Sequence, residues 1–132
     1  MESVKCKVWI TTLQDGKRSV FHSDGSYERT ERGVKVAYSD NEDLVELLVE
    51  PPTAAMERRG ETGLCVRFVQ GETTEFSLGL GEMKGTIPVM TRLVELGEGQ
   101  DRILISLHYD LLFGKTSTQF QLKIQLIFSE AK

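Results

Sequence analysis

The sequence predicts an all-β protein: a closed antiparallel β-barrel of about eight to ten strands, built as a lipocalin-like (calycin-like) meander. Apolar and polar residues alternate with a period of two along most of the chain, which is typical of strands with one buried face. The alternating segments are short and regularly spaced, and Gly-rich or polar turns join them. Sequential hairpins favour a meander, and a closed meander is an up-and-down barrel.

The first half of the chain contains four alternating runs. One apolar phase consists of Val4, Cys6, Val8 and Ile10, then Val34, Val36 and Tyr38, then Val45, Leu47 and Val49. Asp15–Gly16 fits a tight hairpin after the first run. Asp24–Gly25 marks a bulge or a bend in the second run. Pro51–Pro52 ends the run before it, because proline cannot continue a central strand.

Residues 39–59 allow two interpretations. The stretch SDNEDLVELLVE could begin a helix capped by Ser39 or Asp40, and AAMERR has no clear type. We prefer a strand for LVELLVE, because its neighbours are strands and two prolines follow it. A helix within this segment stays an alternative, and it would cover part of the outer surface.

The second half of the chain continues the same pattern. Its apolar phase is Leu64, Val66 and Phe68, then Phe76, Leu78 and Leu80, then Ile87, Val89, Thr91 and Leu93, then the odd positions from Ile103 to Phe113, then the even positions from Phe120 to Phe128. The stretch GLGEMKG has GxGxxxG spacing and precedes a strand, whereas a dinucleotide fingerprint has GxGxxG before a helix. Gly79, Gly81 and Gly85 therefore fit sharp bending of a barrel.

Length and composition indicate one soluble globular domain over residues 1–132. Sixteen basic and 20 acidic side chains give a net charge of −4. This balance argues against nucleic acid and anionic membrane surfaces, which both require a basic footprint. No apolar run is long enough for a signal peptide or a membrane span, so we expect a cytoplasmic protein. We therefore interpret Cys6 and Cys65 as reduced thiols that fill space in the structure, with no functional role.

A serine, a histidine and an aspartate alternate in ILISLHYDLLF, residues 103–113. Ser106, His108 and Asp110 share one face of a strand, with Cβ atoms about 7 Å apart. A catalytic triad requires the base within about 3 Å of the nucleophile, which parallel side chains on one strand rarely achieve. We therefore interpret this face as the solvated outside of the barrel, and we expect no catalytic site and no enzyme.

Other polar residues also favour structural roles. His22 has no metal-ligand partner at a suitable spacing, so we expect a surface histidine. The run from Asp40 to Asp43 lacks the glycine and the glutamate of a calcium-binding loop. We therefore interpret this run as a solvated turn. Arg67 and Arg92 fall on the polar phase, as exposed cations. We accordingly expect no metal and no cofactor.

Several short motifs together resemble the bacterial YwiB-like proteins, a domain-of-unknown-function family with a calycin-like barrel. They are DGSY (24–27), VAYSDNED (36–43), ERRG (57–60), VRFVQG (66–71), GLGEMKG (79–85), TRL (91–93) and ISLHYDL (105–111). The resemblance implies the barrel fold and no established activity. It picks out Gly25, Tyr27, Tyr38, Arg58, Gly60, Phe68, Gly71, Phe76, Gly81, Thr91 and Tyr109, whereas His108 is not part of the pattern. If Arg58 caps one barrel mouth, it could pair with an anionic head group.

The predicted interior suggests a binding function. Its lining is apolar except for Thr91 and the hydroxyls of Tyr38 and Tyr109. A barrel of about eight strands is either filled by its own side chains or holds one small ligand. We expect a non-enzymatic binder of a small apolar or amphipathic molecule, of about fatty-acid size. The expected ligand-binding residues are Tyr38, Arg58, Phe68, Phe76, Thr91 and Tyr109.

The alternative function uses the outer surface of a filled barrel to bind a second copy or another protein. Apolar residues occur in the outer phase: Trp9, Leu13, Leu48, Val69, Met90, Val94, Leu104, Leu112 and Ile127. Closure of the barrel would bring Trp9 next to the last strand. A contiguous apolar patch there would mark an interface.

Overall fold

The computed structural model describes residues 3–80 and 82–128, which form ten strands and no helix. The strands are β1 (Val4–Gln14), β2 (Lys17–Arg29), β3 (Val34–Asp40), β4 (Asp43–Glu50), β5 (Thr53–Arg59), β6 (Thr62–Val69), β7 (Thr73–Leu80), β8 (Met83–Glu98), β9 (Arg102–Phe113) and β10 (Thr116–Phe128). The predicted fold class is confirmed. None of the described residues belongs to a helix that could cross a membrane.

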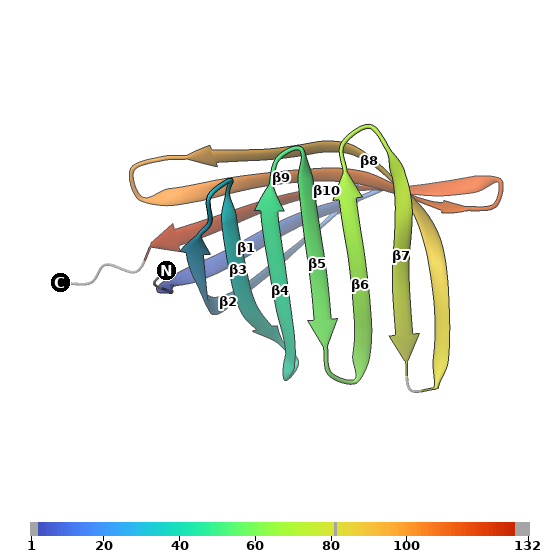
Figure 1. Cartoon of the computed structure of the whole chain (residues 1–132), viewed down its shortest axis with the longest axis horizontal. Helices are drawn as coiled ribbons and strands as arrows, with labels where there is room; N and C mark the ends of the chain where they lie inside the picture. The colour runs from blue at the N-terminus through green and yellow to red at the C-terminus, as the bar shows by residue number, and fades with distance from the viewer. Residues whose placement is uncertain (1–2, 81, 129–132) are drawn as a thin grey trace.

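Each strand pairs with the next one along the chain, and β1 pairs with β10 to close the barrel. All of these pairings are antiparallel. The closure sets Trp9 next to the last strand, as predicted, where it lies opposite Gln125. Strands β3 to β7 run side by side on one face of the barrel, and β9, β10 and β1 cross behind them (Figure 1). The barrel is therefore flattened into two crossing layers.

Strand β8 connects the two layers. Its first half pairs with β7, and its second half pairs with β9. Figure 1 shows β8 turning from one layer into the other. The register of its pairing with β9 shifts between Thr91 and Leu93, which marks a β-bulge. The extra residue reverses the faces that follow it, so Val94 is buried in the core. The prediction of Leu93 inside and Val94 outside is therefore wrong, because a strict period of two does not detect a bulge.

Residues 39–59 contain no helix, so the strand interpretation is correct there. Asn41 and Glu42 form the two-residue turn between β3 and β4, both with positive φ. AAMERR lies within β5, and Pro51 and Pro52, joined by a cis bond, form the turn that precedes it. The Asp15–Gly16 hairpin is also confirmed, with φ of 50° and 87° that suit a type I′ turn.

The inward-facing side chains form one packed cluster in the barrel. Phe68 is 1% exposed, and it is the largest of the side chains that are fully buried. Buried apolar side chains of nine strands contribute to the cluster: Cys6, Val8, Ile10, Tyr27, Val34, Val36, Leu47, Val49, Ala54, Val66, Phe68, Val89, Val94, Ile103, Ile105, Leu107, Tyr109, Leu111, Leu122, Ile124 and Leu126. Most of these residues belong to the apolar phase that the sequence predicts.

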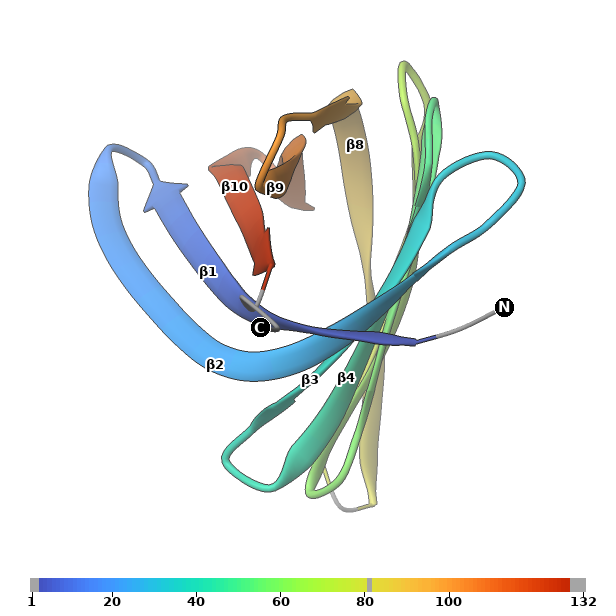
Figure 2. The ribbon, with the colours of Figure 1, turned by 90° about the vertical axis from the view of Figure 1, so that its left-hand side faces the viewer.

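Strand β2 curves strongly along its length (Figure 2). Gly25 lies within this strand, where the sequence predicts a bulge or a bend. The pairing of β2 with β1 continues through this position without a shift, so the feature is a bend and not a bulge. A Cβ atom on Gly25 would lie 2.6 Å from the Ala37 carbonyl oxygen and 2.8 Å from Val8 Cγ2. The bend thus brings the backbone of β3 too close for any side chain at this position.

We predict that Gly25→Ala lowers the free energy of unfolding by about 1–3 kcal/mol, because the new methyl group overlaps the β3 backbone. The matched control is Gly97→Ala, since a Cβ at Gly97 meets nothing within 4 Å. Urea unfolding of both variants checks the prediction. Equal midpoints for the two variants would contradict the close approach.

Candidate functional site

One end of the barrel exposes inward-facing side chains. Antiparallel alternation places the turns after β1, β3, β5, β7 and β9 at this end. Six inward apolar side chains near these turns are partly buried: Phe21, Tyr38, Leu64, Phe76, Ile87 and Phe120. Leu78, which faces the same way, is 39% exposed. We call these seven residues, together with Arg58, the barrel mouth.

Aromatic rings line the space behind the mouth. Tyr109 on β9 packs against Phe120, with ring centroids 5.1 Å apart, and against Phe68 at 4.9 Å. Phe68 lies on β6, which is not a neighbour of β9, so this contact crosses the interior. Phe21 and Tyr38 pack with centroids 5.7 Å apart. The interior behind the mouth is therefore aromatic and well filled.

Arg58 is at the mouth, where two aspartates hold its guanidinium group. Its Nε donates to Asp43 Oδ2 at 2.9 Å, and one terminal nitrogen donates to Asp40 Oδ2 at 3.0 Å. Asp43 is buried, and its other oxygen accepts from the Glu61 backbone N–H at 3.1 Å. The hydrogen bond from Arg58 lowers the pKa of Asp43, and burial opposes this effect. The prediction of a simple solvated turn at 40–43 is wrong for Asp43.

Gly60 makes room for this ion pair. It has φ of 150°, and a Cβ atom there would lie 1.8 Å from Asp43 Oδ1. A residue with a side chain at this position would displace the carboxylate from Arg58. The ERRG motif of residues 57–60 therefore contains both the cation and the glycine that its partner requires.

Three hydroxyl groups face the interior. Burial raises the pKa of Tyr38 to about 12, with a smaller contribution from the charge of Asp40. The pKa of Tyr109 is also raised to about 12, first by burial and then by Tyr38. Both phenols are therefore neutral donors at physiological pH. Thr91 is fully buried, and no described group hydrogen-bonds to its Oγ1.

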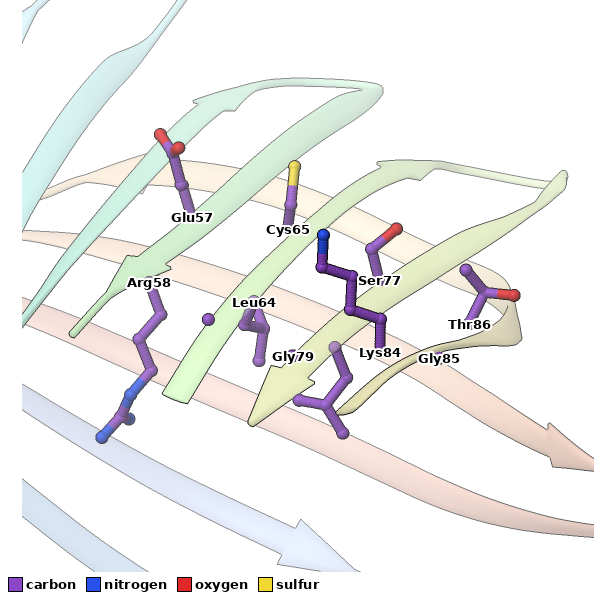
Figure 3. A pocket seen from close by; sticks show the side chains of 11 residues that line it. Glu57, Arg58, Leu64, Cys65, Ser77, Gly79, Lys84, Gly85 and Thr86 are labelled. Carbon is purple, nitrogen blue, oxygen red and sulfur yellow. The ribbon is translucent and has the colours of Figure 1, made fainter. Parts of the chain in front are cut away.

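A groove of about 620 Å³ lies at the rim of the mouth, across β5 to β8. Arg58 and Leu64 point to one side of the sheet there, and Glu57, Cys65 and Ser77 point to the other (Figure 3). Its remaining walls are Gly63, Leu78, Gly79, Lys84, Gly85 and Thr86. The groove is therefore lined by residues from both faces of the sheet. Gly81 lies outside the described residues.

The six predicted site residues all face inward, but at different depths. Arg58, Tyr38 and Phe76 are at the mouth, whereas Tyr109, Phe68 and Thr91 are buried behind it. The sequence interpretation missed Asp40 and Asp43 as partners of Arg58. A signal was present, because both fall on the inward phase of β3 and β4. It also missed Leu64 and Leu78, which the alternation places inside but cannot place at an open end.

Ser106, His108 and Asp110 lie on the outer face of β9, as predicted, but Asp110 is not solvated. Asp110 is 6% exposed and accepts from Arg92 at 2.6 and 3.0 Å. Among the described residues, His108 has no hydrogen bond to Ser106 or Asp110. The aspartate therefore orients Arg92 near the β8 bulge, and the three residues do not form a triad.

The two cysteines differ in their exposure to solvent. Cys6 is buried, and burial raises the pKa of its thiol to about 11. Cys65 is exposed on the outer face, so it does not fill the core as predicted.

Within residues 3–80 and 82–128, no three His, Cys, Asp or Glu side chains gather closely enough to hold a metal ion. His22 is exposed and stacks on Trp9 with ring centroids 4.7 Å apart.

Comparison with known proteins finds similarity in structure. No family model matches the sequence, and no curated protein matches it. The crystal structure of the YwiB protein from Bacillus subtilis aligns with a TM-score of 0.70, at 17% identity, over 96% of this chain and 93% of that chain. At this identity the likeness shows the shared fold alone, and it assigns no ligand and no activity.

We predict that Asp43→Asn lowers the free energy of unfolding at neutral pH. In this variant the free energy of unfolding should also fall less steeply as the pH is lowered into the acid range. The folded-state pKa of Asp43 is lowered, so its ion pair stabilises the fold above the unfolded pKa of about 3.9. This stabilisation is lost as pH falls through the acid range. Unfolding free energies measured from pH 7 to pH 2 check this. Glu42→Gln, an exposed neighbour, is the control, and an identical pH profile in the two variants would contradict the prediction.

We also predict that one thiol reacts with Ellman's reagent in the folded protein and that both react in denaturant. Cys65 is exposed, whereas Cys6 is buried with a raised pKa, which disfavours the reactive thiolate. The Cys65→Ser variant should show no fast reaction. Rapid labelling of that variant would mean that the β1 region of the barrel opens readily.

Proposed function

We propose that the chain is a non-enzymatic binding protein that holds a small amphipathic molecule at the barrel mouth. The exposure of inward-facing apolar side chains at one end is the observation that carries this proposal. Leu78 is 39% exposed although it faces the barrel interior, and Leu64 and Phe76 beside it are only partly buried. The rim groove of about 620 Å³ is within the size range of small-molecule sites.

The packed centre limits how deep such a molecule can go. Phe68 and Val89 are almost completely buried, and the ring of Tyr109 crosses to Phe68. The bound molecule would therefore lie against Phe21, Phe76 and Phe120 near the mouth. A wide internal cavity of the kind that encloses a whole fatty acid is not required for this function.

We further propose that the chain is a member of the YwiB-like family of bacterial proteins and acts in the cytoplasm. The shared fold and the ordered short motifs support the family. The two cysteines are both free, which suits a reducing compartment.

A second candidate function, an outer-surface interface with another copy of the chain, is favoured by exposed apolar side chains on the outer faces of β2, β1 and β9. They are Val20, Trp9 and Leu104, which are 50%, 39% and 39% exposed. Gln125 of β10 lies between Trp9 and Leu104. Exposed apolar side chains that gather on one surface favour an interface.

We predict that Leu78→Glu weakens binding of the neutral dye Nile red by at least about tenfold, because it places a charge at an apolar mouth. Leu104→Glu is the matched control, because Leu104 has the same exposed fraction but lies on the outer face. Fluorescence titration measures both dissociation constants. Equal weakening, or none in Leu78→Glu, would contradict binding at the mouth. A dimer that Leu104→Glu separates would instead support the outer interface.

A further inference from the structure

The outer face of the barrel has a groove that the proposed function does not use. It lies across β8, β9, β10, β1 and the start of β2, and its volume of about 640 Å³ is within the size range of small-molecule sites. Ser106 and His108 of β9 line it. We call it the His108 groove. These two side chains form no catalytic triad, but they face a hollow in which side chains of five strands meet.

The strand register sets a first row of side chains across the His108 groove. Ser106 is paired with Glu95 of β8 on one side and with Lys123 of β10 on the other. Two strand spacings, about 10 Å, separate Glu95 from Lys123. The ion pairs of the described residues include neither of these two charges. The row therefore presents a carboxylate at one end, a cation at the other, and a hydroxyl group between them.

A second row of side chains runs beside the first. His108 is paired with Gln121 of β10. Leu13 of β1 separates Gln121 from Arg18 of β2. His108 and Gln121 are partly buried, yet the hydrogen bonds of the described residues include none from their side chains. An imidazole and an amide are therefore available to a molecule in the groove.

The charges of the His108 groove favour an anion. Arg18 and Lys123 contribute two positive charges and Glu95 contributes one negative charge, so with His108 neutral the lining sums to +1. Arg18, like Lys123, belongs to no ion pair of the described residues. The two cations are on β2 and β10, whereas Glu95 is on β8, beyond β9. An anion between β10 and β2 would therefore meet both cations and lie away from the carboxylate.

Two other grooves differ from the His108 groove in their charges. The rim groove has the cations Arg58 and Lys84 and the carboxylate Glu57, but Asp40 and Asp43 already bind Arg58 there. A groove of about 420 Å³ on the outer face of β3 to β7 is lined by two cations and three carboxylates, a sum of −1: Lys35, Arg67, Glu46, Glu57 and Glu75. Among these three grooves, a positive sum that rests on two unpaired cations belongs to the His108 groove.

We propose that the His108 groove binds a small phosphorylated polyol, such as a sugar phosphate. Lys123 and Arg18 pair with the phosphate, and the Gln121 amide donates to it. A phosphate group has three acceptor oxygens that point in different directions, which suits two cations that approach from the two sides of β1. The site is separate from the barrel mouth and does not rest on the proposed function.

The other side of the groove suits hydroxyl groups. Glu95 is a carboxylate and accepts hydrogen bonds only, whereas Ser106 can donate and accept. Hydroxyl groups of the bound molecule donate to Glu95 and exchange hydrogen bonds with Ser106 and His108. A molecule with an anionic group at each end would instead bring one of them against Glu95.

Equilibrium dialysis tests the proposal with four probes: ribose 5-phosphate, ribose, inorganic phosphate and ribonate. We expect ribose 5-phosphate to bind tightest, because it joins a phosphate to hydroxyl groups in one molecule. Added NaCl should weaken its binding, because Arg18 and Lys123 are exposed and salt screens exposed charges.

Variants of the two cations locate the phosphate. Lys123→Gln and Arg18→Gln should each weaken binding of ribose 5-phosphate about three- to tenfold, the effect of one lost ion pair at an exposed site. Lys35→Gln is the matched control, because Lys35 is an exposed strand lysine of the groove whose charges sum to −1. Glu95→Ala should weaken binding of ribose 5-phosphate and leave binding of inorganic phosphate equal or tighter.

Several results would overturn the proposal. Unchanged binding in both cation variants, or equal weakening in Lys35→Gln, would mean that the anion responds to the surface charge as a whole. Ribonate or ribose that binds as tightly as ribose 5-phosphate would exclude phosphate recognition, and no binding of ribose 5-phosphate at millimolar concentration and low salt would exclude the site. Nile red binding at the barrel mouth should be the same in Lys123→Gln as in the unmodified protein, so the proposed function is tested separately by Leu78→Glu.

Discussion

The pairing of β1 with β10 is the constraint on which the rest of the structure depends. Nine successive residue pairs, from Cys6–Phe128 to Gln14–Phe120, join the two ends of the meander. Closure removes both free edges and gives every strand one inner and one outer face. The inner faces then have to be apolar throughout, which explains the period of two along the sequence. Closure also leaves two ends, so any access to the interior depends on how the side chains fill those ends.

Alternation made the fold predictable, because burial on one side of a strand is a local and repeated property. The same rule explains the errors. At Arg92 one added residue reverses the faces, so Leu93 and Val94 exchange places, and nothing in the alternation itself indicates this bulge. Asp43 and Asp110 are buried, and each accepts hydrogen bonds from an arginine of the neighbouring strand, Arg58 on β5 and Arg92 on β8. Such pairings depend on the register between two strands, which the pattern of a single strand does not contain.

The candidate site was partly predictable for the same reason. The side of the sheet that a residue faces follows from its place in the apolar–polar alternation of the strand. This rule identified the inward-facing site residues Tyr38, Phe68, Phe76, Thr91 and Tyr109. Depth in the barrel does not follow from phase, since it requires the stagger of all ten strands. Arg58 shows the difference clearly. Its position at the mouth was anticipated, but its two aspartate partners reverse the electrostatic meaning of that position, because they use the guanidinium that an anion would need.

A barrel can retain a fold while its interior chemistry changes, so the likeness to YwiB informs the scaffold and not the ligand. The residues that carry chemistry here are therefore those that the fold does not require. Closure and packing need Phe68, Leu47 and Ile105, but neither needs a hydroxyl at Thr91, where a methyl group would pack equally well and would leave no polar atom unpaired. The Thr91 hydroxyl lies in the packed interior, and neither the closure of the barrel nor the packing of its core explains why a polar atom stands there.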